Sequence, residues 1–251
     1  MLRFFSKIRL KLAAENKPVK YIRYAIGEIV LVVIGILIAL QINNWNEKRK
    51  IGLKEIAVLN DILQSIKSDL FDYKRFDDKR LERKKNGLDS LNSYIFDSKN
   101  ISDSLFIAFY QDMKQDFHIR FDNGPFEALK SAGLEIISND SLRALINNTY
   151  TVVLPAYKLP VDEVYNRNET EISKYEHIIL KLHPVIHKDG QKHLDLIPKV
   201  DQIIKNEYFF WIYNLEQEKY SEYVLRLNQI IKRLNNLENK IEEELKSLSR
   251  K

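Results

Sequence analysis

The sequence predicts an all-α protein in which one N-terminal transmembrane helix precedes an elongated antiparallel helical bundle with long first and last helices. The 251-residue chain contains only 7 Gly and 6 Pro, too few turn residues for a Rossmann, TIM-barrel or β-sandwich fold of this size. An uninterrupted apolar run occupies residues 29–40. Beyond it, hydrophobic residues recur every three or four positions over two long stretches that contain almost no helix breakers.

The apolar run belongs to a predicted transmembrane helix over residues 24–45. Tyr24 and Trp45 stand at its two ends, where amphipathic aromatic residues meet the headgroup region of a bilayer. A helix of this length extends about 33 Å, enough for a hydrocarbon core of about 30 Å. The alternatives are a cleaved signal peptide and a buried core helix. The long basic stretch before the run and the aromatic residues at both ends favour an uncleaved anchor.

Charge predicts the orientation of this helix. The formal net charge is +5, and residues 1–24 contain seven of the 40 basic residues but only one of the 35 acidic residues. The positive-inside rule therefore places residues 1–23 in the cytoplasm as a basic amphipathic segment, and residues 46–251 outside the cytoplasm as a helical-bundle domain. The opposite orientation, a cytoplasm-facing coiled-coil tether, remains an alternative. Because residues beyond 24 are nearly neutral, we expect no nucleic-acid partner.

Four residues of the span are candidate contacts with the membrane or with a partner. Glu28 is the one acidic residue inside the span, near enough to its end to reach the interface or a partner helix. Gly35 and Ala39 form a small-xxx-small pair that would let a second helix approach closely. With Trp45, these residues predict contact with the lipid bilayer and allow a homodimer or a partner membrane protein.

Residues 24–47 also carry a distinctive pattern, formed by Glu28, Gly35, Gln41, Asn43, Asn44 and Trp45. This pattern resembles the N-terminal signature of a family of small single-pass membrane proteins of Gram-negative bacteria, a domain of unknown function. The resemblance continues through residues 126–133 and at Leu142-Arg143. It implies a shared architecture and location, with residues 46–251 as the periplasmic domain of a bacterial inner-membrane protein. It brings no known activity, ligand or catalytic residue.

The two longest helices are expected after the span and at the C-terminus. A stripe from Ile56 to Tyr73 predicts a first helix continuous with the span, with a phase shift near residues 77–85, a charged stretch interpreted as a solvated face. From Lys205 onward, a heptad repeat predicts a helix of about 45 residues. Its stripe could form a coiled coil between chains, but pairing with the first helix inside the chain is favoured. The repeat comprises Tyr213, Tyr220, Leu227, Leu234, Ile241 and Leu248.

Shorter elements are expected between these helices. Ser102 and Asn139 are predicted N-caps of two short helices, and Pro125 and Gly133 bracket a third. Residues 101–150 would then cap the bundle or hold a ligand groove. Residues 150–180 predict a further helix, disturbed by Pro155 and Pro160.

The sequence identifies no catalytic, cofactor-binding or metal-binding residue. The chain has no Cys, which excludes Cys-ligated metals and cysteine nucleophiles, and it has no glycine-rich phosphate loop. The spacing of four clustered histidines does not place two on one helical turn, so they are interpreted as surface loop residues. We therefore expect a non-enzymatic binding, sensory or scaffold protein of the cell envelope that acts through a partner. An envelope enzyme with a site in residues 101–195 remains the alternative. The histidines are His177, His183, His187 and His193.

Overall fold

The structure, a computed structural model, describes residues 18–97, 100–186 and 190–250. It is mostly helical, at 81%, with few strands. The chain divides into two compact units, Met1–Glu55 and Ile56–Lys251, which are described separately. Most of the basic segment expected over residues 1–23 lies outside the described residues.

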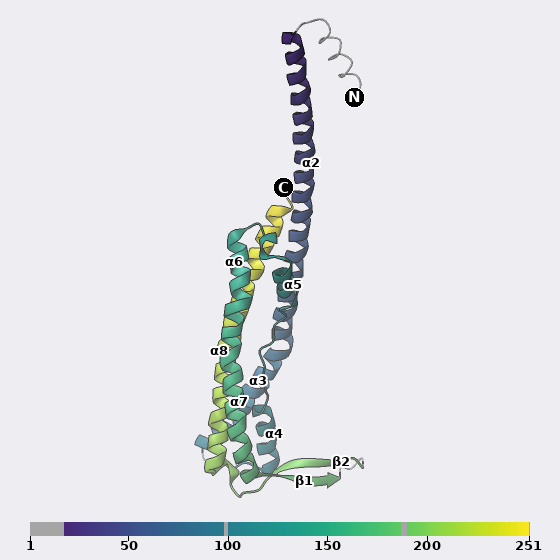
Figure 1. Cartoon of the computed structure of the whole chain (residues 1–251). Coiled ribbons are helices and arrows are strands. Elements are labelled where there is room, and N and C mark those ends of the chain that lie inside the picture. Colours follow the sequence, from purple (N-terminus) through teal and green to yellow (C-terminus); the bar gives the residue numbers. More distant parts are fainter. Residues whose placement is uncertain (1–17, 98–99, 187–189, 251) are drawn as a thin grey trace. The chain divides into compact units, whose positions relative to one another are not determined.

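The elements follow one another in a simple order (Figure 1). They are α2 (Pro18–Asp72), the π-helix η1 (Tyr73–Asp77), α3 (Asp78–Phe96), α4 (Asp103–Met113), α5 (Gly124–Ala132), the 3₁₀-helix η2 (Leu134–Ile136), α6 (Asp140–Asn148), the π-helix η3 (Thr149–Val153), α7 (Leu154–Ile179), β1 (Leu180–Ile186), β2 (Lys192–Pro198), the 3₁₀-helix η4 (Ile203–Lys205) and α8 (Glu207–Leu248).

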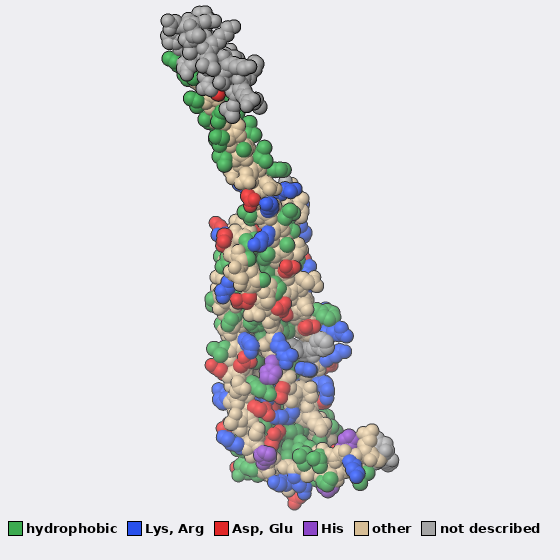
Figure 2. Space-filling model, turned by 45° about the vertical axis from the view of Figure 1, so that its right-hand side comes forward, with side chains coloured by type: hydrophobic (Ala, Val, Ile, Leu, Met, Phe, Trp, Pro, Cys, Tyr) green, Lys and Arg blue, Asp and Glu red, His purple; other side chains and the backbone are tan. Residues whose placement is uncertain are grey.

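Within the Met1–Glu55 unit, helix α2 exposes apolar side chains on every side. Its large apolar side chains from Ile29 to Ile42 are each between 47% and 64% exposed. Among the described residues, this helix alone is long and apolar enough to cross a membrane. Figure 2 shows the hydrophobic side chains covering this part of the helix.

Helix α2 continues without a break past Trp45 to Asp72, which confirms that no linker follows the apolar run. The expected change of phase also has a structural counterpart, because η1 inserts a π-helical turn between α2 and α3. A π-turn widens the helix locally and rotates the residues that follow.

The Ile56–Lys251 unit has two hydrophobic clusters. The first joins α2 residues such as Leu59 and Ile66 to α8 residues such as Leu234 and Ile241. The second joins α3, α4 and the end of α7 to the start of α8, with Phe106 and Phe209 in edge-to-face contact at 5.1 Å. The hydrophobic stripe of α8 is therefore buried inside the chain, but its main neighbour is α7 rather than the first helix.

The stripe of α8 changes register in its first half. Leu227, Leu234 and Ile241 are buried at the expected positions, whereas Tyr213 and Tyr220 are only half-buried. Ile212 and Lys219 are buried in place of Tyr213 and Tyr220, while Phe209 and Glu216 extend the buried positions of Tyr223, Ile230 and Leu237. The heptad assignment was wrong there by one residue, and the correct register places two charged residues in the core.

Local sequence signals determine where the shorter helices begin and end. The side chains of Ser102 and Asn139 accept hydrogen bonds from the backbone N–H groups of Leu105 and Leu142, so both expected N-caps are confirmed. Gly133 follows α5 with φ +107, a conformation that favours glycine. Gly87 lets α3 and α4 approach closely, because a Cβ atom there would lie 2.4 Å from the backbone nitrogen of Met113.

A β-hairpin corrects the all-α prediction. Strands β1 and β2 pair antiparallel with Leu180 opposite Pro198 and Ile186 opposite Lys192. His183 and His193, interpreted as loop residues, lie on these strands, while His177 lies in α7. His187 is outside the described residues. In the sequence, the alternation of apolar and polar residues on both sides of the Asp-Gly pair at positions 189–190 is the signal that predicts such a hairpin.

Candidate functional site

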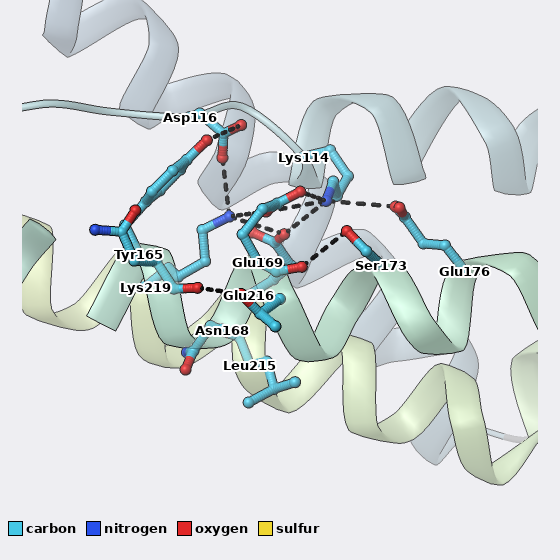
Figure 3. A network of polar contacts seen from close by, with 12 residues as sticks. Lys114, Asp116, Tyr165, Asn168, Glu169, Ser173, Glu176, Leu215, Glu216 and Lys219 are labelled. Carbon is cyan, nitrogen blue, oxygen red and sulfur yellow. Dashed lines mark hydrogen bonds and ion pairs between the residues drawn. The ribbon is translucent and has the colours of Figure 1, made fainter. Parts of the chain in front are cut away.

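The Ile56–Lys251 unit contains a group of paired charged side chains, three of them buried and four partly exposed, which we call the buried ionic cluster. They come from α3, from the residues that directly follow α4, from α7 and from α8 (Figure 3). Burying a charge is costly unless it is paired, so such a group needs its own explanation. The cluster consists of Lys84, Lys114, Asp116, Glu169, Glu176, Glu216 and Lys219.

The centre of the cluster is an ion pair with no solvent exposure. Lys84 and Glu216 both have side chains that are 0% exposed, and they form a direct ion pair. The Lys84 Nζ atom also donates to the backbone carbonyl of Met113 at 2.6 Å. Both residues occupy inward-facing positions of their helices, α3 and α8, so helix packing brings them together. Lys84 therefore corrects the interpretation of residues 77–85 as a solvated face.

Lys219, one helical turn after Glu216, connects three carboxylates. Its Nζ atom lies 2.9 Å from an oxygen of Asp116, 2.9 Å from one of Glu169 and 3.2 Å from one of Glu216. The same nitrogen lies 4.7 Å from the ring centroid of Tyr165, a cation–π contact. Lys219 thus joins α7, α8 and the segment after α4.

Lys114 closes the other side of the cluster. Its Nζ atom lies 3.1 Å from Glu169, 3.3 Å from Glu176 and 3.4 Å from Glu216. The Tyr110 hydroxyl donates a hydrogen bond to Glu176. Three lysines therefore face four carboxylates, and each lysine is paired with at least one of them.

The surroundings shift the pKa values of these groups in consistent directions. Burial lowers the pKa of Lys84, and the attraction of Glu216 offsets only part of that effect. Burial also acts to lower the pKa of Lys219, but Glu216, Asp116 and Glu169 outweigh it and raise the pKa above its usual value. For Asp116, the opposing effect of burial is overcome by Lys219, so its pKa is lowered.

The cluster leaves little room for a substrate. The adjoining cavity measures about 10 Å³, space for about one water molecule, and its lining includes Lys84, Tyr165 and Lys219. Among the described residues, every buried side-chain nitrogen or oxygen has a hydrogen-bond partner. In such a network the groups satisfy one another, which fixes the packing of the helices that carry them.

Two wider hollows lie on the surface of the same unit. One, of about 530 Å³, lies between α6 and α8 and includes Asn139 and Lys240. The other, of about 500 Å³, lies at the base of the hairpin and includes His177, Leu182 and Lys199. Both are open to solvent.

The four residues singled out from the sequence all lie on α2 in the other unit. Glu28, Gly35 and Ala39 fall near one line along the helix, because positions seven and four apart share a face. A Cβ atom at Gly35 would meet nothing within 4 Å. Trp45 is 67% exposed, and the Arg49 guanidinium lies 6.0 Å from its ring centroid.

The sequence analysis missed the buried ionic cluster. Its signal was present, since Glu216 and Lys219 continue the three- and four-residue spacing between Ile212 and Tyr223. Within the described ranges, no group of three or more His, Cys, Asp or Glu residues could hold a metal ion, and this includes the histidines His177, His183 and His193.

Comparison with known proteins gives a match to a protein family. The family model described as a family of unknown function, DUF6090, matches residues 28–185, more than half of the chain. The match includes Glu28, Gly35, Ala39 and Trp45, and it ends inside β1. No curated protein and no solved structure matches the chain significantly.

Proposed function

The chain belongs to this family of unknown function, and we propose that it is a membrane-anchored, non-enzymatic binding or scaffold protein of the cell envelope that acts through a partner. The observation that carries the proposal is the exposed apolar surface of α2. A helix that is apolar on all sides needs an apolar environment, and a bilayer supplies one. The basic residues before it favour a cytoplasmic N-terminus and a periplasmic C-terminal unit.

The buried ionic cluster supports a scaffold role for the C-terminal unit. A network of mutually paired charges holds four segments in one arrangement and gives specificity to their packing. We propose that the unit works as a rigid, elongated antiparallel bundle. Its short helices over residues 101–150 would then close the bundle. The alternative is an enzyme with a site in residues 101–195. Such a site would require either that the paired carboxylates of the cluster separate to admit a substrate, or that the substrate binds in the open hollow at the base of the hairpin.

The line of Glu28, Gly35 and Ala39 is the proposed surface for a partner helix. Small residues let helix backbones approach closely inside a bilayer, and an acidic group close to them would select a polar or basic neighbour. A photo-crosslinking residue at Ala39 should therefore yield an adduct with a protein in intact membranes. The matched control is the same residue at Leu37, about 160° away around the helix from Ala39, which should react with lipid. Equal protein adducts at both positions, or none at either, would contradict this surface.

The topology has an independent test, because the chain contains no Cys. A Ser249→Cys variant should react with a membrane-impermeant maleimide in intact spheroplasts. A Ser6→Cys variant should react only after lysis. The reverse pattern would show that the C-terminal unit faces the cytoplasm and would favour the coiled-coil tether.

A further inference from the structure

The β-hairpin has a polar and an apolar face. Even-numbered positions lie on one face, and this face carries Leu182, Ile186 and Leu194, which are 62%, 71% and 65% exposed. Toward the helices the same face continues into the core, where Leu180 is buried and Leu196 is partly buried. Figure 2 shows hydrophobic side chains gathered on the projecting hairpin.

The strand register shows which backbone groups point outward. The N–H of Lys199 donates to the carbonyl of Ile179 at 2.7 Å, so the ladder begins with a hydrogen-bonded pair. Hydrogen-bonded and non-hydrogen-bonded pairs alternate along an antiparallel ladder. The pairs Leu180–Pro198, Leu182–Leu196, Pro184–Leu194 and Ile186–Lys192 are therefore non-hydrogen-bonded, and their backbone groups face the outer edges.

The two outer edges differ. Pro184 lies in the middle of β1 and removes an outward-facing N–H, so it blocks that edge against a further strand. On β2 the outward-facing residues Lys192, Leu194 and Leu196 keep their N–H groups, and proline appears only at the end, at Pro198. Strand β2 therefore has an open edge in the sense that its outward-facing N–H groups are retained, and the strand also contacts α4 of its own chain.

We propose that the open edge of β2 pairs with β2 of a second copy of this chain, forming a four-stranded sheet across a two-fold axis. This inference does not depend on the proposed function. The axis passes through Leu194, which pairs with Leu194 of the second copy, while Lys192 pairs with Leu196 in both directions. These residues carry the outward-facing groups, so each pair exchanges both backbone hydrogen bonds.

Hydrogen-bonding complementarity of the side chains selects this register. Centring the axis on Leu194 places His193 opposite Asp195 of the second copy, twice, in the closely spaced non-hydrogen-bonded pairs. Moving the axis to Asp195 would set the two aspartates against each other, and moving it to His193 would do the same with the two histidines. The complementary register is the one that brings opposite polarity together.

Pairing would also stabilise the hairpin. A two-stranded ribbon is marginally stable in water, and three or more strands with an apolar face are more stable. The two-fold axis is perpendicular to the sheet, so the apolar faces of both hairpins lie on the same side. The two Leu194 side chains then pack against each other, and the exposed apolar side chains of both hairpins form one continuous surface.

Cysteine crosslinking tests this pairing in the full chain, held in detergent micelles. Leu194→Cys should form an intermolecular disulfide, because directly paired Cα atoms lie about 5.5 Å apart. Leu182→Cys is the matched control, since it is similarly exposed on the same face but lies on β1. Three strand spacings, about 14 Å, would separate its two copies, too far for a disulfide. Equal crosslinking of both variants, no crosslinking of Leu194→Cys, or its capture of a different protein would overturn the proposal.

The register has its own crosslinking test. A mixture of His193→Cys and Asp195→Cys chains should give mixed dimers, while each variant alone should give few. Strong crosslinking of either variant with itself would overturn the register.

Proline substitutions test the hydrogen bonding without crosslinking. Leu194→Pro and Leu182→Pro each remove an N–H that points away from the other strand, so the hairpin's own ladder remains. Leu194→Pro should weaken dimerisation roughly tenfold or more, whereas Leu182→Pro should leave it near the parent value. Sedimentation in matched-density detergent measures the difference. Equal effects of the two prolines would overturn the assignment of the edge.

Discussion

Glu216 is the carboxylate that pairs with fully buried Lys84, so replacing it tests whether the buried ionic cluster stabilises the fold. Glu216→Gln keeps the shape of the side chain and removes its charge. Lys114 and Lys219 retain Asp116, Glu169 and Glu176, which lie within 3.3 Å of one or the other. Lys84 keeps the Met113 carbonyl but loses its ion pair. The cost of the substitution should therefore arise mainly at Lys84.

The expected loss in the free energy of unfolding has an upper limit. Removing one partner of a buried ion pair typically costs about 3–5 kcal/mol. If the penalty were larger, Lys84 would release its proton, and deprotonating an ordinary lysine at pH 7 costs about 5 kcal/mol. We therefore expect Glu216→Gln to reduce the free energy of unfolding by about 3–5 kcal/mol at pH 7.

The pH dependence identifies the cause. Burial already lowers the pKa of Lys84 in the parent, and removing Glu216 lowers that pKa further. The unfolded chain then binds more protons than the folded chain between the two pKa values of Lys84. Stability therefore rises with pH in that window. From pH 7 to pH 10 the variant should recover stability more steeply than the parent, by up to about 1.4 kcal/mol per pH unit.

Urea unfolding of the full chain in detergent micelles, followed by circular dichroism, measures both effects. The control is Glu243→Gln on the same helix, whose ion pair with Lys240 is exposed. Such a pair contributes less than about 1 kcal/mol. A Glu216→Gln cost equal to that of the control, or one that does not shrink with rising pH, would refute the reasoning.

Three further predictions concern stability and are measured in the same unfolding assay. Gly87→Ala should destabilise the protein by about 1–3 kcal/mol, because its Cβ would meet the backbone of Met113 and Phe109 at 2.4 and 2.7 Å. The matched control Gly52→Ala has nothing within 4 Å and should stabilise α2 by about 0.5–1 kcal/mol; equal effects would contradict this reasoning. Burial raises the pKa of Asp69 to about 6, so the folded chain binds more protons than the unfolded chain between pH 4 and 6, and stability should fall as pH rises through that range. Asp69→Asn should remove that pH dependence and increase the free energy of unfolding by about 1 kcal/mol at pH 7. Gly133→Ala should cost about 1–2 kcal/mol, since φ is +107 there, and a neutral effect would argue against that backbone conformation.

The helical elements were predictable where local rules apply. The long continuous α2, the α8 helix and the caps at Ser102 and Asn139 follow from spacing, from the scarcity of Gly and Pro, and from side chains that accept backbone hydrogen bonds. These signals act over three or four residues, so they can be recognised without knowledge of the rest of the chain.

The buried ionic cluster was not predictable by the same rules. A lysine within a charged stretch is usually solvated, and Lys84 looked no different from Lys85, which is exposed. What distinguishes them is the partner, since Glu216 is 132 positions away along the chain. The hairpin was missed for a different reason. A low content of Gly and Pro describes the average of the chain, and it does not exclude one short pair of strands.

The sequence by itself determined a mostly helical protein, an apolar segment long enough to cross a bilayer and the limits of most helices. Only the tertiary structure decided which charges are buried, which edge of the hairpin is open and how the register of α8 shifts. The physical reason is that helix formation and apolar character depend on neighbours in the chain. Burial and pairing of charges depend on residues that the fold brings together from distant positions.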